Sequence, residues 1–260
     1  MKYFALFGNP VSHSISPRLH NSALCGLGID GIYGRILLEQ GGDIIAKFKK
    51  YNLQGANITV PFKESVLTFC DELDSIARDI GSINTLVRIG NKVKGYNTDA
   101  PGFMMAISEF GKVKKALILG AGGTAKALAY ILTLSGADVD ILNRSNKSEQ
   151  FKNYQFYTHT NFTPSDYDLV VNTTSAGLCG DELPCDINLL RDIFANSKFA
   201  FDVIYNKNTP FLRLANESNL KIKDGKDMLL YQAVLAFNIF FDNKFDESKI
   251  TQLMRRAFEL

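Results

Sequence analysis

The strongest constraint on this chain is a short apolar strand that leads directly into a glycine-rich turn and a helix. Residues 116–119 are apolar, residues 120–125 read GAGGTA, and the pattern then turns helical as far as residue 135. A second apolar strand, residues 139–142, ends about 20 residues after the turn, at the spacing typical of a dinucleotide-binding βαβ unit.

Each position of the turn has a physical task in nucleotide binding. Gly120 permits the sharp turn, Gly122 lets the backbone approach a pyrophosphate, and Ala125 allows close helix–strand packing. The exposed amides at the start of the helix offer partial positive charge to phosphates. The alternative is a turn that only connects strand and helix. We predict a dinucleotide site formed by Gly120, Ala121, Gly122, Gly123, Thr124 and Ala125.

The end of the second strand predicts which dinucleotide binds. An NAD site would place Asp or Glu there for the ribose hydroxyls. This chain has Asn143, Arg144 and Ser145 instead, with Lys147 close behind. An arginine offers a planar fork of donors and a permanent positive charge, which match a 2′-phosphate. These residues favour NADP; the alternative for Arg144 is a solvated surface side chain.

Short apolar runs alternate with helical periods from end to end, and this alternation predicts an α/β fold. A chain of 260 residues suits two domains. We expect an N-terminal α/β substrate domain, residues 1–99 with 226–260, and an NADP-binding Rossmann domain, residues 100–225. Helices expected at 228–241 and 248–259 would return to the first domain.

Composition excludes several classes of function. The chain has 29 basic and 27 acidic residues, a balance that argues against nucleic acid or an anionic membrane surface as partner. No apolar run reaches the roughly 18 residues of a membrane span, and residues 3–7 are too short a run for a signal peptide. The four cysteines form no C-x-x-C pair, so we expect no metal site and a reducing cytoplasm. Monomer and homodimer both stay open.

Pairs of polar residues stand two positions apart in the first domain. Ser14 and Ser16 would point the same way in an extended loop, and Asn57 and Thr59 share one face at the end of a strand. Ser16 precedes Pro17, so its alternative role is a helix N-cap. For Asn57 and Thr59 the alternative is that they satisfy local backbone groups in a turn.

Lys63 is a candidate for proton transfer. We expect a helix to begin near it, and the positive end of that helix would ease the loss of its proton, as general acid–base chemistry near neutrality requires. The alternative is a solvated surface lysine.

A predicted hairpin supplies a partner for such a lysine. A two-residue turn at Gly90-Asn91 makes Asn84 face Asn97 and places Asp99 diagonally across from Asn84. A carboxylate beside an ammonium can orient it and share its proton. Asp99 could instead cap the helix that follows it.

Segments across almost the whole chain, in the family's order, strongly resemble the shikimate dehydrogenase family. They are GNPVSHSISP (8–17), NITVPFK (57–63), GSINTL (81–86), NTD (97–99), GAGG (120–123), NR (143–144), NTTSAG (172–177), DVIY (202–205) and QA (232–233).

The resemblance implies the reversible NADPH-linked reduction of 3-dehydroshikimate to shikimate, a step in chorismate and aromatic amino acid biosynthesis. Lys63, paired with Asp99, would transfer the proton. The implied substrate ligands are Ser14 and Ser16 for the carboxylate, and Asn57, Thr59, Asn84, Asp99, Tyr205, Gly225 and Gln232. The implied cofactor ligands are Gly120, Ala121, Gly122, Gly123, Thr124, Ala125, Asn143, Arg144, Ser145, Lys147 and Val203.

Two rival interpretations stay open at this point. One is a quinate/shikimate dehydrogenase that also uses NAD, and the other is a non-catalytic NADP-binding sensor. The chain departs from the family pattern at Lys207, where proline is usual, and at Asp227, where glycine is usual. The first departure predicts a looser loop beside the cofactor.

Overall fold

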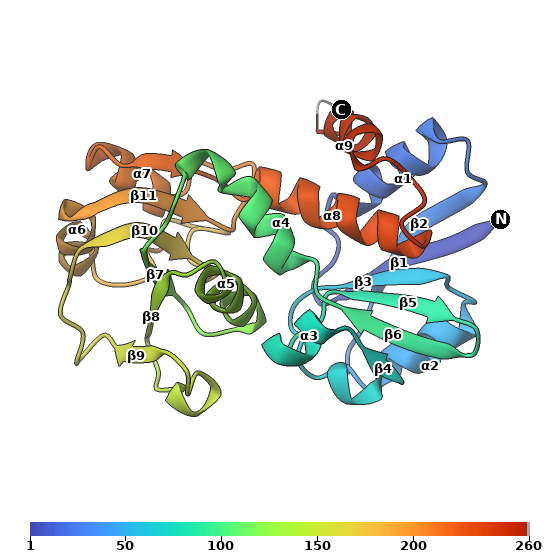
Figure 1. Cartoon of the computed structure of the whole chain (residues 1–260), viewed down its shortest axis with the longest axis horizontal. Coiled ribbons are helices and arrows are strands. Elements are labelled where there is room, and N and C mark those ends of the chain that lie inside the picture. The colour runs from blue at the N-terminus through green and yellow to red at the C-terminus, as the bar shows by residue number, and fades with distance from the viewer. Residues whose placement is uncertain (259–260) are drawn as a thin grey trace. The chain divides into compact units, whose positions relative to one another are not determined.

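The computed structural model describes residues 1–258 and divides into two compact units (Figure 1). One unit is Met1–Gly102 together with the described part of Leu230–Leu260, and the other is Phe103–Leu229. Within the described residues, no helix is both long and apolar enough to cross a bilayer.

The first unit is built on a mixed sheet with the strand order β2-β1-β3-β5-β6-β4. Strand β1 pairs in parallel with β2 and β3, whereas β5 runs antiparallel to β3 and to β6. The elements of this unit are β1 (Lys2–Gly8), α1 (Ser16–Gly26), β2 (Gly31–Leu37), α2 (Asp43–Lys50), β3 (Gly55–Ile58), the 3₁₀ helix η1 (Leu67–Phe69), β4 (Glu72–Leu73), α3 (Ser75–Ile80), β5 (Thr85–Ile89), β6 (Lys92–Tyr96) and α9 (Glu247–Arg256).

These strand directions bring separate polar segments to one edge of the sheet. Because β5 is antiparallel to β3 and β6, the end of β3, the start of β5 and the end of β6 lie at the same edge, where β1 also ends. A core that includes Phe7, Phe48 and Leu86 packs beneath. The segments that follow β1, β3 and β6, and the one that precedes β5, therefore converge.

The last helix belongs to this first unit. Helix α9 lies against α1, where the Ser22 hydroxyl donates to the Leu253 carbonyl at 2.6 Å and the Leu253 side chain lies where a Cβ on Gly26 would stand. This packing confirms the predicted return of the C-terminal helices to the first domain. The expected final residue of that helix, Glu259, lies outside the described residues.

The second unit is a parallel sheet with the strand order β12-β11-β10-β7-β8-β9. Chain order reverses between β7 and β10, which is where open α/β sheets bind ligands. Its elements are η2 (Ser108–Phe110), β7 (Lys115–Leu119), α5 (Gly123–Leu134), β8 (Asp138–Asn143), η3 (Ser148–Gln150), β9 (Gln155–Thr158), β10 (Tyr167–Asn172), α6 (Ile187–Ala195), β11 (Ser197–Asp202), α7 (Pro210–Glu217) and β12 (Lys221–Lys223).

The apolar strands of the second unit are buried because helices cover the sheet, as with α5 in Figure 1. This is the Rossmann strand order, and the predicted α/β fold class is confirmed. Two helices, α4 (Asp99–Ala106) and α8 (Lys226–Phe240), contain the points at which the chain changes unit.

Candidate active site

The centre of the polar edge in the first unit is an ion pair between Lys63 and Asp99. The Lys63 Nζ lies 2.6 Å from Asp99 Oδ2, and the two side chains are only 15% and 8% exposed. The other carboxylate oxygen, Oδ1, accepts a hydrogen bond from Asn84 Nδ2 at 2.9 Å. Both oxygens of the carboxylate are thus engaged, so its orientation is fixed.

The hairpin prediction that led to this pair is confirmed. Strands β5 and β6 pair in the register Thr85↔Tyr96 and Ile89↔Lys92, and Gly90 adopts a φ of 58° in the two-residue turn. This register continues to Asn84, which reaches Asp99 as predicted. The alternative, that Asp99 caps the following helix, was wrong: Asp99 is itself the first residue of α4, and the Ala100 amide donates to Asn97 Oδ1 at 3.1 Å.

The local prediction for Lys63 was wrong. No α-helix begins there; the residue lies in a turn, and the helix expected to begin near it is replaced by the short 3₁₀ helix Leu67–Phe69. Three residues align too few peptide dipoles to act on a nearby ammonium. The electrostatic partner of Lys63 is Asp99, which is 36 residues away in sequence.

Buried amide side chains surround the pair. Asn84 Oδ1 accepts from the backbone amide of Thr98 at 2.8 Å, and Asn84 Nδ2 also lies 3.4 Å from Gln232 Oε1. Gln232 can come this close because α4 has Gly102 opposite it, where a Cβ would stand 2.7 Å from the Gln232 backbone nitrogen. The structure thus brings together Lys63, Asp99, Asn84 and Gln232 from four separate segments.

The two serines form a second buried cluster at this edge. The Ser14 and Ser16 hydroxyls are 3.1 Å apart, and Ser14 Oγ accepts the Ser16 amide at 3.2 Å. The N-cap of α1 is Ile15, with no side-chain hydrogen bond, so the N-cap alternative for Ser16 was wrong. Arg35 fixes this loop, because its Nε and Nη2 both donate to the Ser14 carbonyl.

The remaining predicted residues of this edge have separate environments. Asn57 is buried and donates to the Asn84 carbonyl at 3.2 Å. Thr59 is half-buried, and its methyl group packs where a side chain on Gly8 would stand. Asn57 therefore belongs to the amide cluster, while Thr59 lies beside the end of β1.

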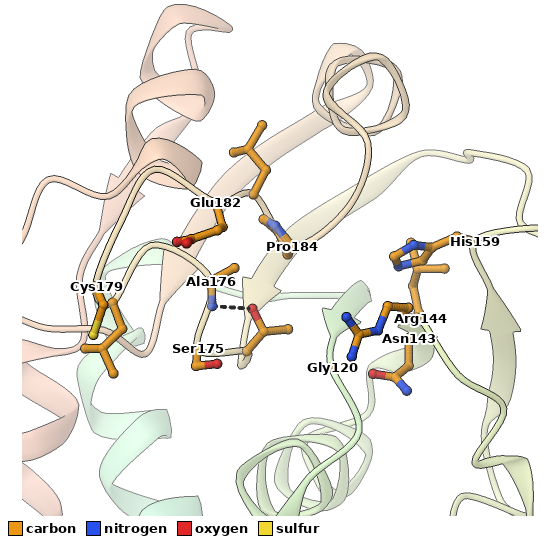
Figure 2. Close-up of a pocket in the computed structure, with 13 residues that line it drawn as sticks. Gly120, Asn143, Arg144, His159, Ser175, Ala176, Cys179, Glu182 and Pro184 are labelled. Atoms are coloured by element: carbon orange, nitrogen blue, oxygen red, sulfur yellow. Dashed lines mark hydrogen bonds between the residues drawn. The ribbon is translucent and has the colours of Figure 1, made fainter. Parts of the chain in front are cut away.

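The second unit carries a pocket of about 540 Å³ at the reversal of strand order (Figure 2). Its walls come from the ends of β7, β8, β9 and β10 and from the loop after β10. The lining residues are Gly120, Leu142, Asn143, Arg144, His159, Thr174, Ser175, Ala176, Leu178, Cys179, Glu182, Leu183 and Pro184.

The glycine turn has the geometry that its sequence predicted. Gly120 adopts a φ of 109°, and a Cβ there would stand 2.6 Å from Thr173 Oγ1. A Cβ on Gly122 would meet open space, so its backbone can be approached, and Ala125 is fully buried in α5. The first turn of α5 contains no acidic residue.

Basic residues lie around this pocket. Arg144 is exposed, and Lys147 Nζ donates to the Ala121 carbonyl at 3.3 Å. Asn143 Nδ2 donates to the Ser145 carbonyl at 2.8 Å, which shapes the loop after β8. Partial burial, followed by the charge of Arg144, lowers the pKa of His159, which lies on the same side of the pocket (Figure 2).

Three further predicted residues, Val203, Tyr205 and Gly225, lie in the second unit at the ends of β11 and β12. A Cβ on Gly225 would stand 2.2 Å from the Val203 carbonyl oxygen, so only glycine fits, and the Gly225 amide donates to the Ile204 carbonyl at 3.0 Å. Lys207, expected to loosen the adjacent loop, donates to the Leu178 carbonyl and so adds a connection there. Asp227 pairs with Lys223 at 3.0 Å.

Several pocket residues were not predicted. His159 follows a short strand with no motif, so nothing in the sequence singles it out. Thr174 and Ser175 lie within the segment NTTSAG, which carried the family resemblance without a site assignment. Because that segment directly follows an apolar strand of a predicted parallel sheet, its position could have identified it as a ligand-binding loop.

Similar proteins share both units. A family model for the shikimate dehydrogenase substrate binding domain matches residues 6–86. The chain is 46% identical to the shikimate dehydrogenase (NADP(+)) of Helicobacter hepaticus, over 95% of this chain and 94% of that protein. It is 42% identical to the enzyme of the same name from Helicobacter pylori strain J99, over 99% of both.

A solved structure extends the likeness to three dimensions. Shikimate 5-dehydrogenase from Thermus thermophilus, in complex with NADP(H) and shikimate, matches with a TM-score of 0.85 and 31% identity, over 99% of this chain and 100% of that chain.

Fold and site together define a class: α/β oxidoreductases with a Rossmann unit and a second unit, which here carries a lysine–aspartate ion pair. Within that class, the chain belongs to the shikimate dehydrogenase family.

Proposed function

We propose that the protein catalyses the reversible NADPH-dependent reduction of 3-dehydroshikimate to shikimate, which serves chorismate and aromatic amino acid biosynthesis. The observation that carries this function is the largely buried Lys63–Asp99 pair at 2.6 Å, set among amide side chains at one edge of the sheet. The solved relative from Thermus thermophilus, a complex with NADP(H) and shikimate, supports both ligands.

The chemistry of the first unit suits a small acid with several hydroxyl groups. The Ser14 and Ser16 hydroxyls would hold its carboxylate, with the Arg35 guanidinium behind them. Asn84, Asp99 and Gln232 would hold the ring hydroxyls. A site of this kind discriminates strongly, because an analogue that lacks a hydroxyl leaves buried polar groups unpaired. Asn57 and Thr59 would complete the substrate side.

Lys63 would move the proton. When shikimate is oxidised, a ring hydroxyl loses its proton as the carbon loses hydride, and Lys63 Nζ would take that proton while Asp99 holds the amine in place. In the reverse direction the same nitrogen returns the proton to the oxygen. NADP, when bound, accepts or supplies the hydride.

The second unit fits NADP. Open space at Gly122 and the N-terminus of α5 suit the pyrophosphate, together with Ala121, Gly123 and Thr124. The end of β8 carries Asn143 where NAD proteins carry an acid, and Arg144, Ser145 and Lys147 would surround the 2′-phosphate. Val203 would lie near the nicotinamide, and Tyr205 and Gly225 near the substrate.

The decisive experiment follows the absorbance of NADPH as the purified chain oxidises shikimate. We expect turnover with shikimate and NADP, and little with quinate or with NAD. Comparable rates with quinate or NAD would favour the quinate/shikimate dehydrogenase alternative, and NADP binding without turnover would favour the sensor. We also propose a cytoplasmic location, with which four unpaired cysteines agree.

A further inference from the structure

Tyr33 on β2 is buried, yet its hydroxyl is placed for more than packing. Its ring stacks on His20 with centroids 4.2 Å apart and planes 5° apart. Asn21 holds its backbone from both sides: Asn21 Oδ1 accepts the Tyr33 amide at 2.8 Å, and Asn21 Nδ2 donates to the Tyr33 carbonyl at 2.9 Å. The ring and the backbone of Tyr33 are therefore fixed in position, and its hydroxyl points in one direction.

That hydroxyl begins a continuous line of hydrogen bonds. Tyr33 Oη donates to Asn57 Oδ1 at 2.8 Å, and Asn57 Nδ2 donates to Thr85 Oγ1 at 3.0 Å. Thr85 Oγ1 donates to Asn84 Oδ1 at 3.0 Å, and Asn84 Nδ2 donates to Asp99 Oδ1 at 2.9 Å. The line ends where Asp99 Oδ2 accepts from Lys63. The side chains of Tyr33, Asn57, Thr85, Asn84 and Asp99 are all buried.

Backbone groups fix the orientation of the two side-chain amides in the line. The Asn84 carbonyl can only accept, so the Asn57 atom that faces it at 3.2 Å must be the Nδ2 donor. The Thr98 amide can only donate, so the Asn84 atom that faces it at 2.8 Å must be Oδ1. The Thr85 hydroxyl accepts from Asn57 and donates to Asn84 Oδ1 at 3.0 Å, with the Thr98 hydroxyl farther away at 3.4 Å. Tyr33 must donate, because Asn57 Oδ1 can only accept.

We propose that Tyr33 is a positioning residue for the Lys63–Asp99 pair and acts through this line of hydrogen bonds. Without its hydroxyl, Asn57 Oδ1 loses this donor in a buried site, and the bonds that follow lose the polarisation that a continuous line provides. Burial raises the pKa of Tyr33 well above its usual value, so the hydroxyl remains a donor at physiological pH. This inference rests on the proposed function only for its kinetic consequence.

The test compares Tyr33→Phe with wild type. This variant keeps the ring and its stacking on His20 and removes only the hydroxyl. We expect kcat for shikimate to fall about tenfold, the effect of one buried hydrogen bond, with a smaller change in KM. Tyr51→Phe, an exposed tyrosine of the same unit, is the matched control and should leave kcat unchanged.

A second variant separates positioning from simple packing. Thr85→Val breaks the middle of the line with little change in shape. If the line transmits the effect, kcat of the double variant Tyr33→Phe/Thr85→Val is no more than about twofold below kcat of the less active single variant. Losses that multiply, or a Tyr33→Phe enzyme with kcat within twofold of wild type, overturn the proposal.

Nitrogen-15 resonances of substrate-free protein test the line without any assay. We expect the side-chain nitrogen-15 chemical shifts of Asn57, Asn84 and Lys63 to change in Tyr33→Phe and to remain unchanged in Tyr51→Phe. Unmoved Asn84 and Lys63 resonances overturn the inference even if shikimate is a substrate. A wild-type chain that is inactive with shikimate overturns the proposed function, and these resonances then still decide whether Tyr33 acts on the pair.

Discussion

The two units carry their polar groups in opposite ways. In the first, Asn57, Asn84 and Asp99 are buried and hydrogen-bonded to neighbouring side chains, so the orientation of each side chain is fixed. In the second, the pocket is lined by small polar and apolar residues, by His159 and Glu182, and by the exposed Arg144. A small polyol acid is recognised by side chains fixed in advance, whereas a large anion can be held by backbone amides and a surface cation.

Loss of the amine at the centre of the first unit should give the largest effect. We expect Lys63→Ala to lower kcat about 10³-fold, the usual contribution of a general acid–base group, while the affinity for NADP stays the same. Steady-state rates and calorimetric titration of NADP measure the two quantities. Lys92→Ala, which removes an exposed ion pair with Glu72, is the control. Equal kcat in the two variants would contradict the role of Lys63.

Acid should weaken the first unit through His20. Burial lowers the pKa of His20 from 6.5 to about 3, so below pH 6.5 the unfolded chain binds a proton that the folded chain excludes. The contribution of neutral His20 to the free energy of unfolding is fully present above pH 6.5. It is lost as the pH drops towards 3, by about 3 kcal/mol at pH 4.5. Hydrogen exchange of first-unit peptides should show this slope in wild type and lose it in His20→Phe. Identical slopes would mean that another group is responsible.

The open pocket should respond selectively to loss of its cation. We expect Arg144→Ala to weaken NADP binding about 30-fold, the value of charge-assisted hydrogen bonds to a phosphate, and to leave NAD binding unchanged. Binding isotherms for both nucleotides are the measurement. Arg213→Ala, which removes an exposed pair with Asp181 in the same unit, is the matched control. Equal weakening for both nucleotides would remove Arg144 from the 2′-phosphate site.

The smallest expected effect is in the second unit, where acid should raise the stability, the opposite of the effect of His20 on the first unit. Burial raises the pKa of Asp202 from 3.8 to about 6, against hydrogen bonds from Thr209, the Ile204 amide and Asn172. The folded state therefore binds this proton more tightly, and lowering the pH from 8 to 5 should stabilise the unit by about 1 kcal/mol through this group. Hydrogen exchange of second-unit peptides in wild type and Asp202→Asn measures it. An unchanged slope in the variant would contradict it.

Local patterns predicted the second unit well. The strand, glycine turn and helix at residues 116–135 depend on backbone conformation and on short-range packing. Sequence spacing alone was therefore enough to predict that Gly120 and Arg144 stand at the ends of neighbouring strands, where they line the pocket. The hairpin at Gly90-Asn91 likewise carried Asn84 to Asp99 through register alone. Local patterns were not always sufficient: the helix expected to begin near Lys63 does not form, and only the 3₁₀ helix Leu67–Phe69 follows.

By itself, then, the sequence determined most of the elements and which residue types stand at the ends of the strands, because those depend on periodicity and turn chemistry. Only the tertiary structure decided that Lys63 meets Asp99, that Gln232 lies beside Gly102, and that Tyr33 points at Asn57. These contacts join residues far apart in the chain, and strand order and helix packing, rather than any local preference, bring them within hydrogen-bonding distance.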